Sequence, residues 1–464
     1  MNILKKLLIV FLLTIGINAQ KATLDQIVGS AYTSNKGYQF LQRATDETGG
    51  RLMGSDGNKK GIQILKDELK KIGIEAREES FVVPGWRRGD DKLTITKPFE
   101  KPITAFALGY TEKEAPFTAE VVYASYGDTS DYSGISAEGK IVIVTQEAPP
   151  APRKSMIRQE VIRIATLNKA RAVLFTYAER GGRVMVGTGD FHGRPLKVPA
   201  FTIPYEVGKM LVRLLQAGEK VEMSIDVKSY CVPVDTVSNV IASIPGKSDK
   251  KIVVGAHYDS WDLGTGAIDN GLGSAILFDV ARLLKETGKT YDYTIEFVWF
   301  NGEEFGLFGA SNYAEKHKNE NMVAMINMDM VGTPNGWNLM GFDEYRSSFE
   351  TVINNFSGFD LTVGVRSTPW SNSDHVPFLV QGVPVFTPSA SLAPGQGETY
   401  HNYTDTFDKV KRDQLSAAAG FVAGSLHILM TDASMQFKKM PQAQLHQMLK
   451  KNSLYDLLVT QGWI

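Results

Sequence analysis

Five short segments of the chain each end an apolar or glycine-rich run with an acidic residue or a histidine. They span residues 252–259, 266–271, 301–304, 325–329 and 400–406. Two divalent ions held about 3.5–4 Å apart need about five nitrogen or oxygen ligands, one of them a carboxylate that both ions share. The five segments offer that number of ligands and one carboxylate more. They therefore predict hydrolysis by a metal-bound water.

Two of these segments lie close together in the sequence. His257 is followed at i+2 by Asp259, whose carboxylate can accept the second imidazole N–H and so fix the tautomer that presents a lone pair to a metal. Asp269 lies in a glycine-rich loop after the same strand, from which it can reach both ions as a bridge. A buried structural histidine and an ordinary turn aspartate are the alternatives for these two residues taken singly.

The other three segments supply the remaining groups. Glu303 and Glu304 are adjacent, so their side chains diverge, and one can bind metal while the other takes a proton from the bound water. Asp329 ends a largely apolar strand, where a carboxylate is costly unless it is paired or metal-bound. His401 opens a tyrosine-rich loop and is the missing nitrogen ligand of the second ion. Each residue alone would be unremarkable, but the set favours a metal site.

The elements that must position these residues alternate along the second half of the chain. Apolar β-rich runs at 240–244, 252–255, 294–300, 323–327 and 383–387 alternate with helical patterns at 272–285, 309–317, 345–357 and 413–430. This alternation predicts an α/β fold with a central, mostly parallel mixed sheet covered by helices on both faces. Ligands bind beyond the carboxyl ends of such strands, so we expect the candidate residues to gather at one edge.

Changes in the residue pattern along the chain predict further segments and their limits. We expect an N-terminal part of the same domain at 20–116, with a helix at 61–72, and an inserted β-rich module at 117–230 that carries none of the candidate metal ligands. The catalytic part spans 231–430. A C-terminal helical tail at 431–464, with an amphipathic helix at 442–458, is expected to cap the core or to contact a second copy in a homodimer.

The N-terminus and the charge balance restrict the partners. Residues 1–19 have a basic start, an apolar stretch of about 11 residues and a small residue, Ala19. They predict a cleaved signal peptide, because the stretch is well short of the roughly 20 residues of a membrane span. The single cysteine, Cys231, excludes an intrachain disulfide and favours a bacterial periplasm or exterior. The net charge of −1 gives no basic field for nucleic acid or an anionic membrane.

The motifs at 255–262, around Asp269, at 303–310 and at 401–406 resemble those of the two-zinc exopeptidase family, which includes secreted bacterial aminopeptidases and plasma glutamate carboxypeptidases. They keep the family's order over about 150 residues. The resemblance implies two Zn²⁺ per chain and assigns a role to each residue. His257 and Asp329 would hold one zinc, Glu304 and His401 the other, with Asp269 as the bridge, Glu303 as the general base and Asp259 orienting His257.

The resemblance also implies features around the site. The module at 117–230 is similar to the protease-associated domain inserted in several members. Members often have a cis peptide after the bridging aspartate, here Asp269–Asn270, and the stretch 373–375 is similar to one that lines the site.

The expected function is a secreted or periplasmic zinc exopeptidase that hydrolyses short peptides, either an aminopeptidase or a dipeptidase. A carboxypeptidase of the plasma glutamate carboxypeptidase type is the main alternative. A receptor-like relative without catalysis and a cyclising transferase that would need one zinc are weaker ones. A carboxypeptidase needs an arginine or lysine clamp for the substrate carboxylate, and Arg194, Arg346 and Arg366 are available in loops.

Overall fold

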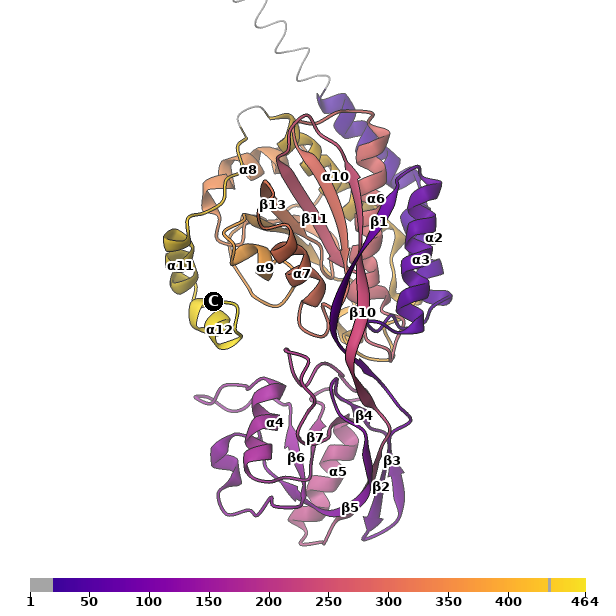
Figure 1. Cartoon of the computed structure of the whole chain (residues 1–464), viewed down its shortest axis with the longest axis vertical. Coiled ribbons are helices and arrows are strands. Elements are labelled where there is room, and N and C mark those ends of the chain that lie inside the picture. Colours follow the sequence, from indigo (N-terminus) through magenta and orange to yellow (C-terminus); the bar gives the residue numbers. More distant parts are fainter. Residues whose placement is uncertain (1–19, 433–434) are drawn as a thin grey trace, which may run out of the picture.

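The computed structural model describes residues 20–432 and 435–464, which form two lobes joined by a long pair of strands (Figure 1). Each lobe is built on its own eight-stranded sheet. The predicted signal peptide, residues 1–19, lies outside the described residues.

The first lobe contains a mixed sheet whose centre is parallel. In spatial order its strands are β1 (Ala76–Arg87), β10 (Tyr230–Ile244), β12 (Thr294–Phe300), β11 (Lys251–His257), β13 (Met322–Asn327), β16 (Val385–Ser391), β14 (Thr333–Asn338) and β15 (Gly364–Arg366). The neighbours β12, β11, β13 and β16 run parallel, whereas β10 and β14 join this core antiparallel. The predicted mixed α/β sheet is confirmed.

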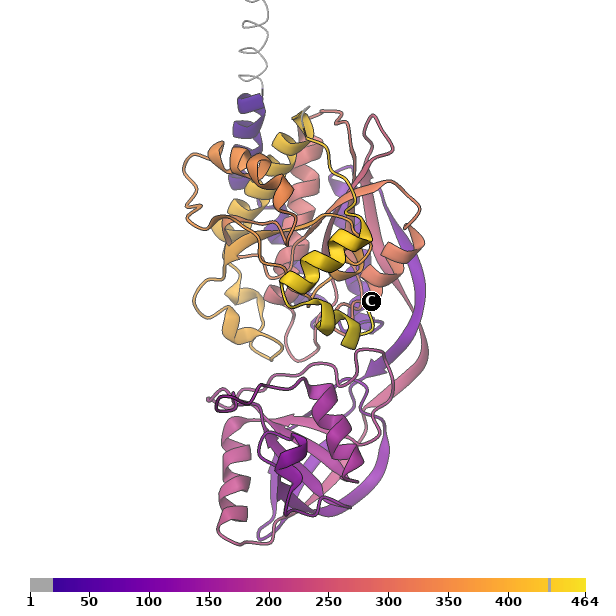
Figure 2. The ribbon, with the colours of Figure 1, turned by 90° about the vertical axis from the view of Figure 1, so that its left-hand side faces the viewer.

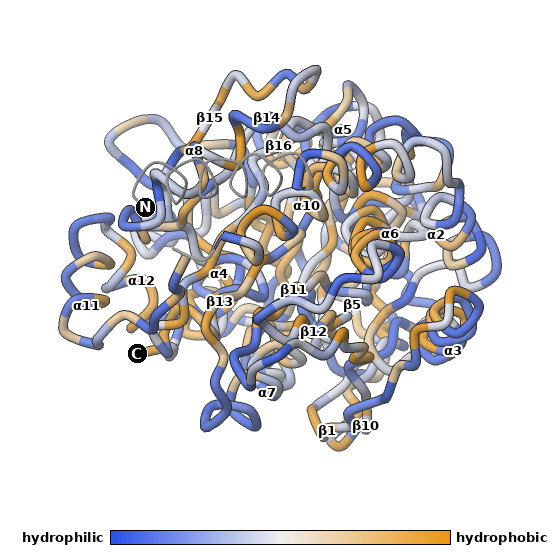
Figure 3. Tube along the Cα trace, turned by 90° about the horizontal axis from the view of Figure 1, so that it is seen from above, coloured by the Kyte–Doolittle hydropathy of each residue, from blue (hydrophilic) through white to orange (hydrophobic). Residues whose placement is uncertain are grey.

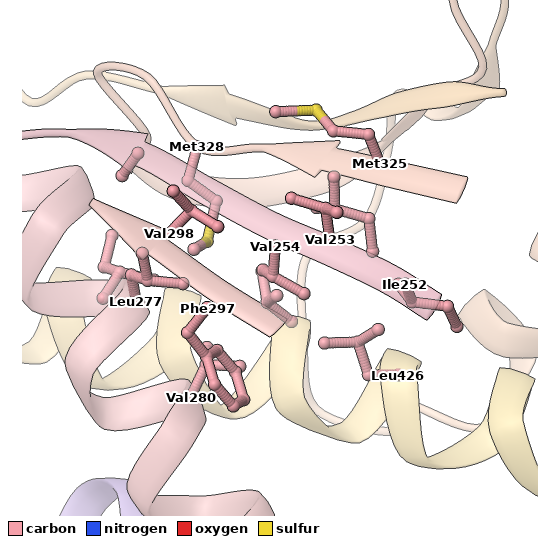
Figure 4. Packing of buried hydrophobic residues seen from close by; sticks show 14 of the residues in the cluster. Ile252, Val253, Val254, Leu277, Val280, Phe297, Val298, Met325, Met328 and Leu426 are labelled. Atoms are coloured by element: carbon pink, nitrogen blue, oxygen red, sulfur yellow. The ribbon is translucent and has the colours of Figure 1, made fainter. Parts of the chain in front are cut away.

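Helices cover both faces of this sheet. They are α2 (Lys36–Asp46), α3 (Asp56–Lys71), α6 (Gly273–Glu286), α7 (Phe308–Lys316), α8 (Arg346–Asn354), α9 (Val376–Leu379) and α10 (Arg412–Thr431). On one face, Leu277 of α6 and Leu426 of α10 lie in the same buried cluster as Val254 and Phe297 of the sheet (Figure 4). On the other face, the ring of Phe300 contacts Tyr313 of α7 and Phe378 of α9. The continuous apolar runs of the central strands reflect this burial on both sides.

Helix α10 is part of this core. Within the described ranges it is the one helix long and apolar enough to cross a membrane by length and composition, and 94% of that stretch is buried inside the lobe. Seen from above, the tube is hydrophobic along α6 and β13 and hydrophilic in many peripheral loops (Figure 3). The apolar character of α10 is therefore that of a core helix.

The second lobe has its own mixed sheet and its own core. In spatial order its strands are β3 (Lys101–Ile103), β2 (Lys92–Lys97), β9 (Glu222–Val227), β5 (Glu114–Tyr123), β6 (Ile141–Thr145), β7 (Ala172–Thr176), β8 (Ala200–Ile203) and β4 (Phe106–Ala107). Two helices, α4 (Arg158–Leu167) and α5 (Tyr205–Gln216), belong to the same lobe. Strands β2, β3 and β4 precede residue 117, so the second sheet starts earlier in the sequence than the expected module. The domain limits themselves stay a prediction.

The two lobes are joined through the paired strands β1 and β10, which run from one sheet toward the other (Figure 1). Arg87, at the end of β1, donates to the carbonyl oxygens of Met53 and Gly54 and to the carboxylate of Asp235 in β10. These contacts of Arg87 fix the β1–β10 pair to the first lobe.

The C-terminal tail forms two short helices, α11 (Gln442–Lys451) and α12 (Tyr455–Thr460), and not the single helix expected at 442–458. The break coincides with Ser453, whose φ of 58° is left-handed. Leu445, Leu449 and Leu458 are buried in the main core cluster, and both helices lie low on the first lobe, above the second (Figure 2). The tail therefore covers part of that core, and a homodimer stays a prediction.

Candidate dinuclear metal site

The candidate residues meet where three adjacent parallel strands end. His257 is the last residue of β11, Glu303 and Glu304 follow β12, and Asp329 follows β13. Because these strands are parallel neighbours, their carboxyl ends share one edge of the sheet.

Asp269 comes from the turn Ala267–Leu272 that leads into α6. Its backbone N–H donates to the carboxylate of Asp405 at 3.0 Å, and that of Ile268 donates to the same carboxylate at 2.7 Å. The Asp269–Asn270 peptide is cis, a point that the sequence had left open. Gly266, before the turn, has φ +60°, and an added Cβ would lie 2.2 Å from Cβ of Ser260, so glycine is required there.

The side chains form two groups that share Asp269. In the first group, Nε2 of His257 lies 3.4 Å from Oδ1 of Asp269 and 3.5 Å from Oδ1 of Asp329. In the second, Nε2 of His401 lies 3.2 Å from Oδ2 of Asp269 and 2.9 Å from Oε2 of Glu304. Ligands at about 2.1 Å in tetrahedral geometry are about 3.4 Å apart. Each group therefore has the spacing of a zinc ligand set, and one carboxylate oxygen of Asp269 faces each.

Both imidazole rings present the atom that a metal needs. Nδ1 of His257 lies 3.1 Å from the carbonyl oxygen of Asp259, and Nδ1 of His401 lies 3.1 Å from that of Val186. A carbonyl oxygen only accepts hydrogen bonds, so in the neutral rings Nδ1 carries the proton and Nε2 presents a lone pair.

The charge of the site also fits bound cations. In the described chain no lysine or arginine forms an ion pair with Asp269, Glu303, Glu304 or Asp329. Burial raises the pKa of Glu304 to about 7, and its Oε1 is buried without a hydrogen-bond partner among the described residues. Buried negative charge needs a counter-charge. Two divalent ions would supply it and would take up the unpaired oxygen.

Histidine pKa values report the same excess of negative charge. Burial alone would lower the pKa of His401, but Glu304 and Asp269 raise it to about 10. Burial likewise opposes protonation of His257, yet Glu303, Asp269 and Asp329 raise its pKa well above the ordinary value.

The geometry separates the two adjacent glutamates. Oε2 of Glu304 belongs to the second ligand group, whereas Glu303 belongs to neither group. Burial raises the pKa of Glu303 well above its ordinary value, and the nearby Asp329 and Asp374 raise it further. A carboxylate with a raised pKa beside the ligand groups is suited to accept and return a proton.

Asp259 contacts His257 differently from the sequence-based expectation. The Nδ1 of His257 is closer to the Asp259 carbonyl oxygen, at 3.1 Å, than to its carboxylate, at 3.7 Å. The carboxylate instead accepts the backbone N–H groups of Glu303 and Glu304, at 3.2 and 3.3 Å. It therefore holds the acidic pair in place as well as lying beside the ring.

The stretch 373–375 lies behind the site. Ser373, Asp374 and His375 have no exposed surface, and the Asp374 carboxylate is buried without a hydrogen-bond partner in the described chain. Burial raises its pKa well above the ordinary value, as do Asp259 and Asp329. Asp374 therefore belongs to the electrostatic surroundings of the first ligand group.

Several residues that position the site are distant in the sequence and were not predicted. Arg51 is fully buried and donates to the carbonyl oxygens of Tyr258, Thr265 and Gly266. Its side chain thus pins the segment between His257 and Asp269. A buried arginine that donates to backbone carbonyl oxygens leaves no periodic signal in a sequence.

Comparisons with known proteins agree with this geometry. Residues 239–425 match the model of peptidase family M28. Carboxypeptidase Q of Bos taurus is 27% identical over 404 residues, which cover 83% of this chain and 83% of that protein. Aminopeptidase YwaD of Bacillus subtilis is 25% identical over 422 residues, 85% of each chain. Residues 239–425, which carry all the candidate site residues, are therefore similar to peptidase family M28. The predicted family resemblance and the predicted class, a metallo-exopeptidase, are thereby confirmed.

Solved structures show the same fold. A peptidase M28 precursor from Shewanella amazonensis superposes with a TM-score of 0.77 at 23% identity, covering 91% of this chain and 99% of that one. A zinc aminopeptidase from Bacillus subtilis gives a TM-score of 0.68 at 21% identity, covering 87% of this chain and 96% of that one. Both lobes lie within the shared architecture, since the coverage exceeds either lobe alone.

Proposed function

We propose that this protein is a zinc-dependent exopeptidase of the M28 type, secreted or periplasmic, that hydrolyses short peptides and above all dipeptides. The observation that carries the proposal is the pair of ligand groups joined by Asp269. Two nitrogen and three carboxylate donors suit Zn²⁺. The names of the relatives, a zinc aminopeptidase and carboxypeptidases, support the metal and the substrate class.

The residues have separate roles in this reaction. His257 and Asp329 would hold one zinc, Glu304 and His401 the other, and Asp269 both. The ions would supply Lewis-acid chemistry, polarising the scissile carbonyl and acidifying a water molecule. Glu303 takes the proton of the attacking water on its carboxylate and returns it to the leaving amine. Asp259 keeps Glu303 and Glu304 in place through their backbone amides.

An arginine beside the second ligand group supports recognition of a free carboxyl terminus. Arg158, at the start of α4, donates to the carbonyl oxygens of Met185 and Val186, and the latter oxygen also contacts the ring of His401. Burial lowers the pKa of Arg158 to about 10. It has no carboxylate partner in the described chain, so a substrate carboxylate would satisfy its free N–H groups.

The arginines suggested by the sequence are less suitable as clamps. Arg194 is paired with Asp190. Arg346 is paired with Asp343 and donates to the Val365 carbonyl. Arg366 ends β15, at the edge of the first sheet. Arg158 therefore replaces them in the proposal.

The test compares one dipeptide in three forms: free, with its carboxyl terminus amidated, and with its amino terminus acetylated. We expect Arg158→Ala to raise KM for the free dipeptide at least about 10-fold, the loss of one charge-assisted hydrogen bond or more, with little change for the amide. Arg163→Ala, which removes an exposed arginine paired with Glu160 on the same helix, is the matched control. Equal losses on free and amidated dipeptide would contradict carboxylate recognition by Arg158.

A further inference from the structure

Two loops, one from each lobe, meet at the second ligand group. Residues 182–187 lie between β7 and β8 of the second lobe, and residues 398–403 lie between β16 and α10 of the first. The Val186 N–H donates to the His401 carbonyl at 3.1 Å. In return, Nδ1 of His401 donates to the Val186 carbonyl at 3.1 Å. One residue of the second lobe thus holds both the backbone and the ring of a candidate metal ligand.

Side chains reinforce this pairing of loops. Arg183 donates to the carbonyl oxygen of Glu398 at 3.2 Å, and the Tyr403 hydroxyl donates to that of Gly182 at 3.2 Å. Val186 itself is fully buried, in an apolar cluster that joins Phe201 of the second lobe to Phe305 of the first. The carbonyl that faces His401 is therefore fixed by the second lobe rather than by solvent.

The two candidate histidines differ in this respect. His257 is oriented by Asp259, two residues further along the same chain segment. His401 has φ +53°, a left-handed conformation that a non-glycine residue adopts only where its surroundings hold it. The first ligand group is therefore complete within one lobe, whereas the second depends on contact between the lobes.

We propose that the second lobe sets the metal affinity of the second position, that of Asp269, Glu304 and His401, by holding His401 through Val186. This inference rests on the proposed zinc site. Outer partners of metal-bound histidines change metal affinity by about 10–100-fold. Val186 is thus a positioning residue, and occupancy of the second position depends on whether the two loops are docked.

The experiment is a zinc titration of metal-free protein against a competing chelating indicator, which yields two stepwise dissociation constants. In the double variant Arg183→Ala/Tyr403→Phe, two of the contacts between the loops are lost. We expect the constant of the second position to rise about 10-fold and that of the first to stay unchanged. Asp329→Asn, which removes a ligand of the first position only, identifies which constant belongs to which position.

Arg163→Ala is the matched control, because it removes an exposed arginine of the second lobe whose ion pair is with Glu160 of the same helix. Unchanged constants in the double variant, or equal rises at both positions, would overturn the inference. If the double variant does not fold, the single variant Tyr403→Phe is titrated instead. We expect its zinc dissociation constant at the second position to rise about threefold, and an unchanged constant would contradict the inference. Absence of zinc binding by the unaltered protein would instead overturn the proposed function.

Discussion

At the scale of single residues, the proposed site separates the candidate metal ligands from the proposed proton acceptor. Oε2 of Glu304 lies 2.9 Å from Nε2 of His401 in a ligand group, and Glu303 lies in neither group. The raised pKa of Glu303, caused first by burial, suits a base that must later act as an acid. The proposal thus gives the two adjacent glutamates different roles.

This separation predicts the behaviour of Glu303→Gln. The amide cannot accept the proton, so we expect kcat for a dipeptide to fall at least about 100-fold. Zinc content, measured by elemental analysis, should stay at the level of the unaltered protein because Glu303 is not a ligand. Glu304→Gln is the comparison and should lose zinc from the second position. Near-normal turnover by the Glu303 variant would remove it from the role of base.

The buried histidine His427, which lies outside the site, should make the stability of the protein depend on pH. Burial lowers the pKa of His427 in α10 to about 4. The unfolded chain, with an ordinary pKa near 6.5, binds more protons between pH 6.5 and 4, so stability falls as the pH falls through that range. From pH 7.5 to 5 this residue should cost about 2 kcal/mol of unfolding free energy.

Urea unfolding at pH 7.5 and pH 5 measures this effect. We expect His427→Gln to lose about 2 kcal/mol less than the unaltered protein between the two pH values. His192→Gln, at an exposed loop position, should follow the unaltered protein. The same loss in the His427 variant as in the unaltered protein would show that burial does not suppress its protonation.

Residue types and spacing were enough to predict which side chains approach one another, because each candidate ligand follows a strand or opens a loop at one sheet edge. The partners of those ligands were not predictable. Val186 acts through its carbonyl oxygen, and Arg51 through bonds to three carbonyl oxygens. Backbone groups carry no residue-specific signal, so only the fold reveals them.

At the scale of elements, the predictable strands are those buried on both faces. β11, β12 and β13 are mostly apolar, and β12 has the predicted bounds. β14 was missed because its sequence, Thr-Pro-Asn-Gly-Trp-Asn, contains turn-forming residues and only one large apolar side chain. It persists as a strand because it pairs with β16 and β15, which is a tertiary effect.

Because Arg51 holds the segment between β11 and α6, we expect Arg51→Met to lower the free energy of unfolding strongly. Methionine has similar length but cannot donate to the carbonyl oxygens of Tyr258, Thr265 and Gly266, which would stay buried and unpaired. We expect a loss of about 3 kcal/mol or more of unfolding free energy, and weaker zinc binding because the segment carries His257 and Asp269. Arg163→Met on the surface should cost less than about 1 kcal/mol. Similar small losses in both variants, measured by urea unfolding of metal-free protein, would contradict this role.

At the scale of the whole molecule, the candidate metal site lies where the first lobe meets a loop of the second. The glycine-rich texture of 117–230 indicated a separate β-rich module without ligand candidates. The contact of its loop with His401 was not predictable, because residues 186 and 401 are far apart in sequence and neither belongs to a periodic element. The tail was similarly ambiguous, since an amphipathic pattern is the same for a core cap and for a subunit contact.

The measurement that decides most directly is anomalous X-ray diffraction at the zinc absorption edge, from crystals of protein purified without chelator. We expect two anomalous peaks about 3.5–4 Å apart, one on each side of the Asp269 carboxylate, with His257 and Asp329 at one and Glu304 and His401 at the other. A single peak, or two peaks that do not share Asp269, would contradict the dinuclear zinc site.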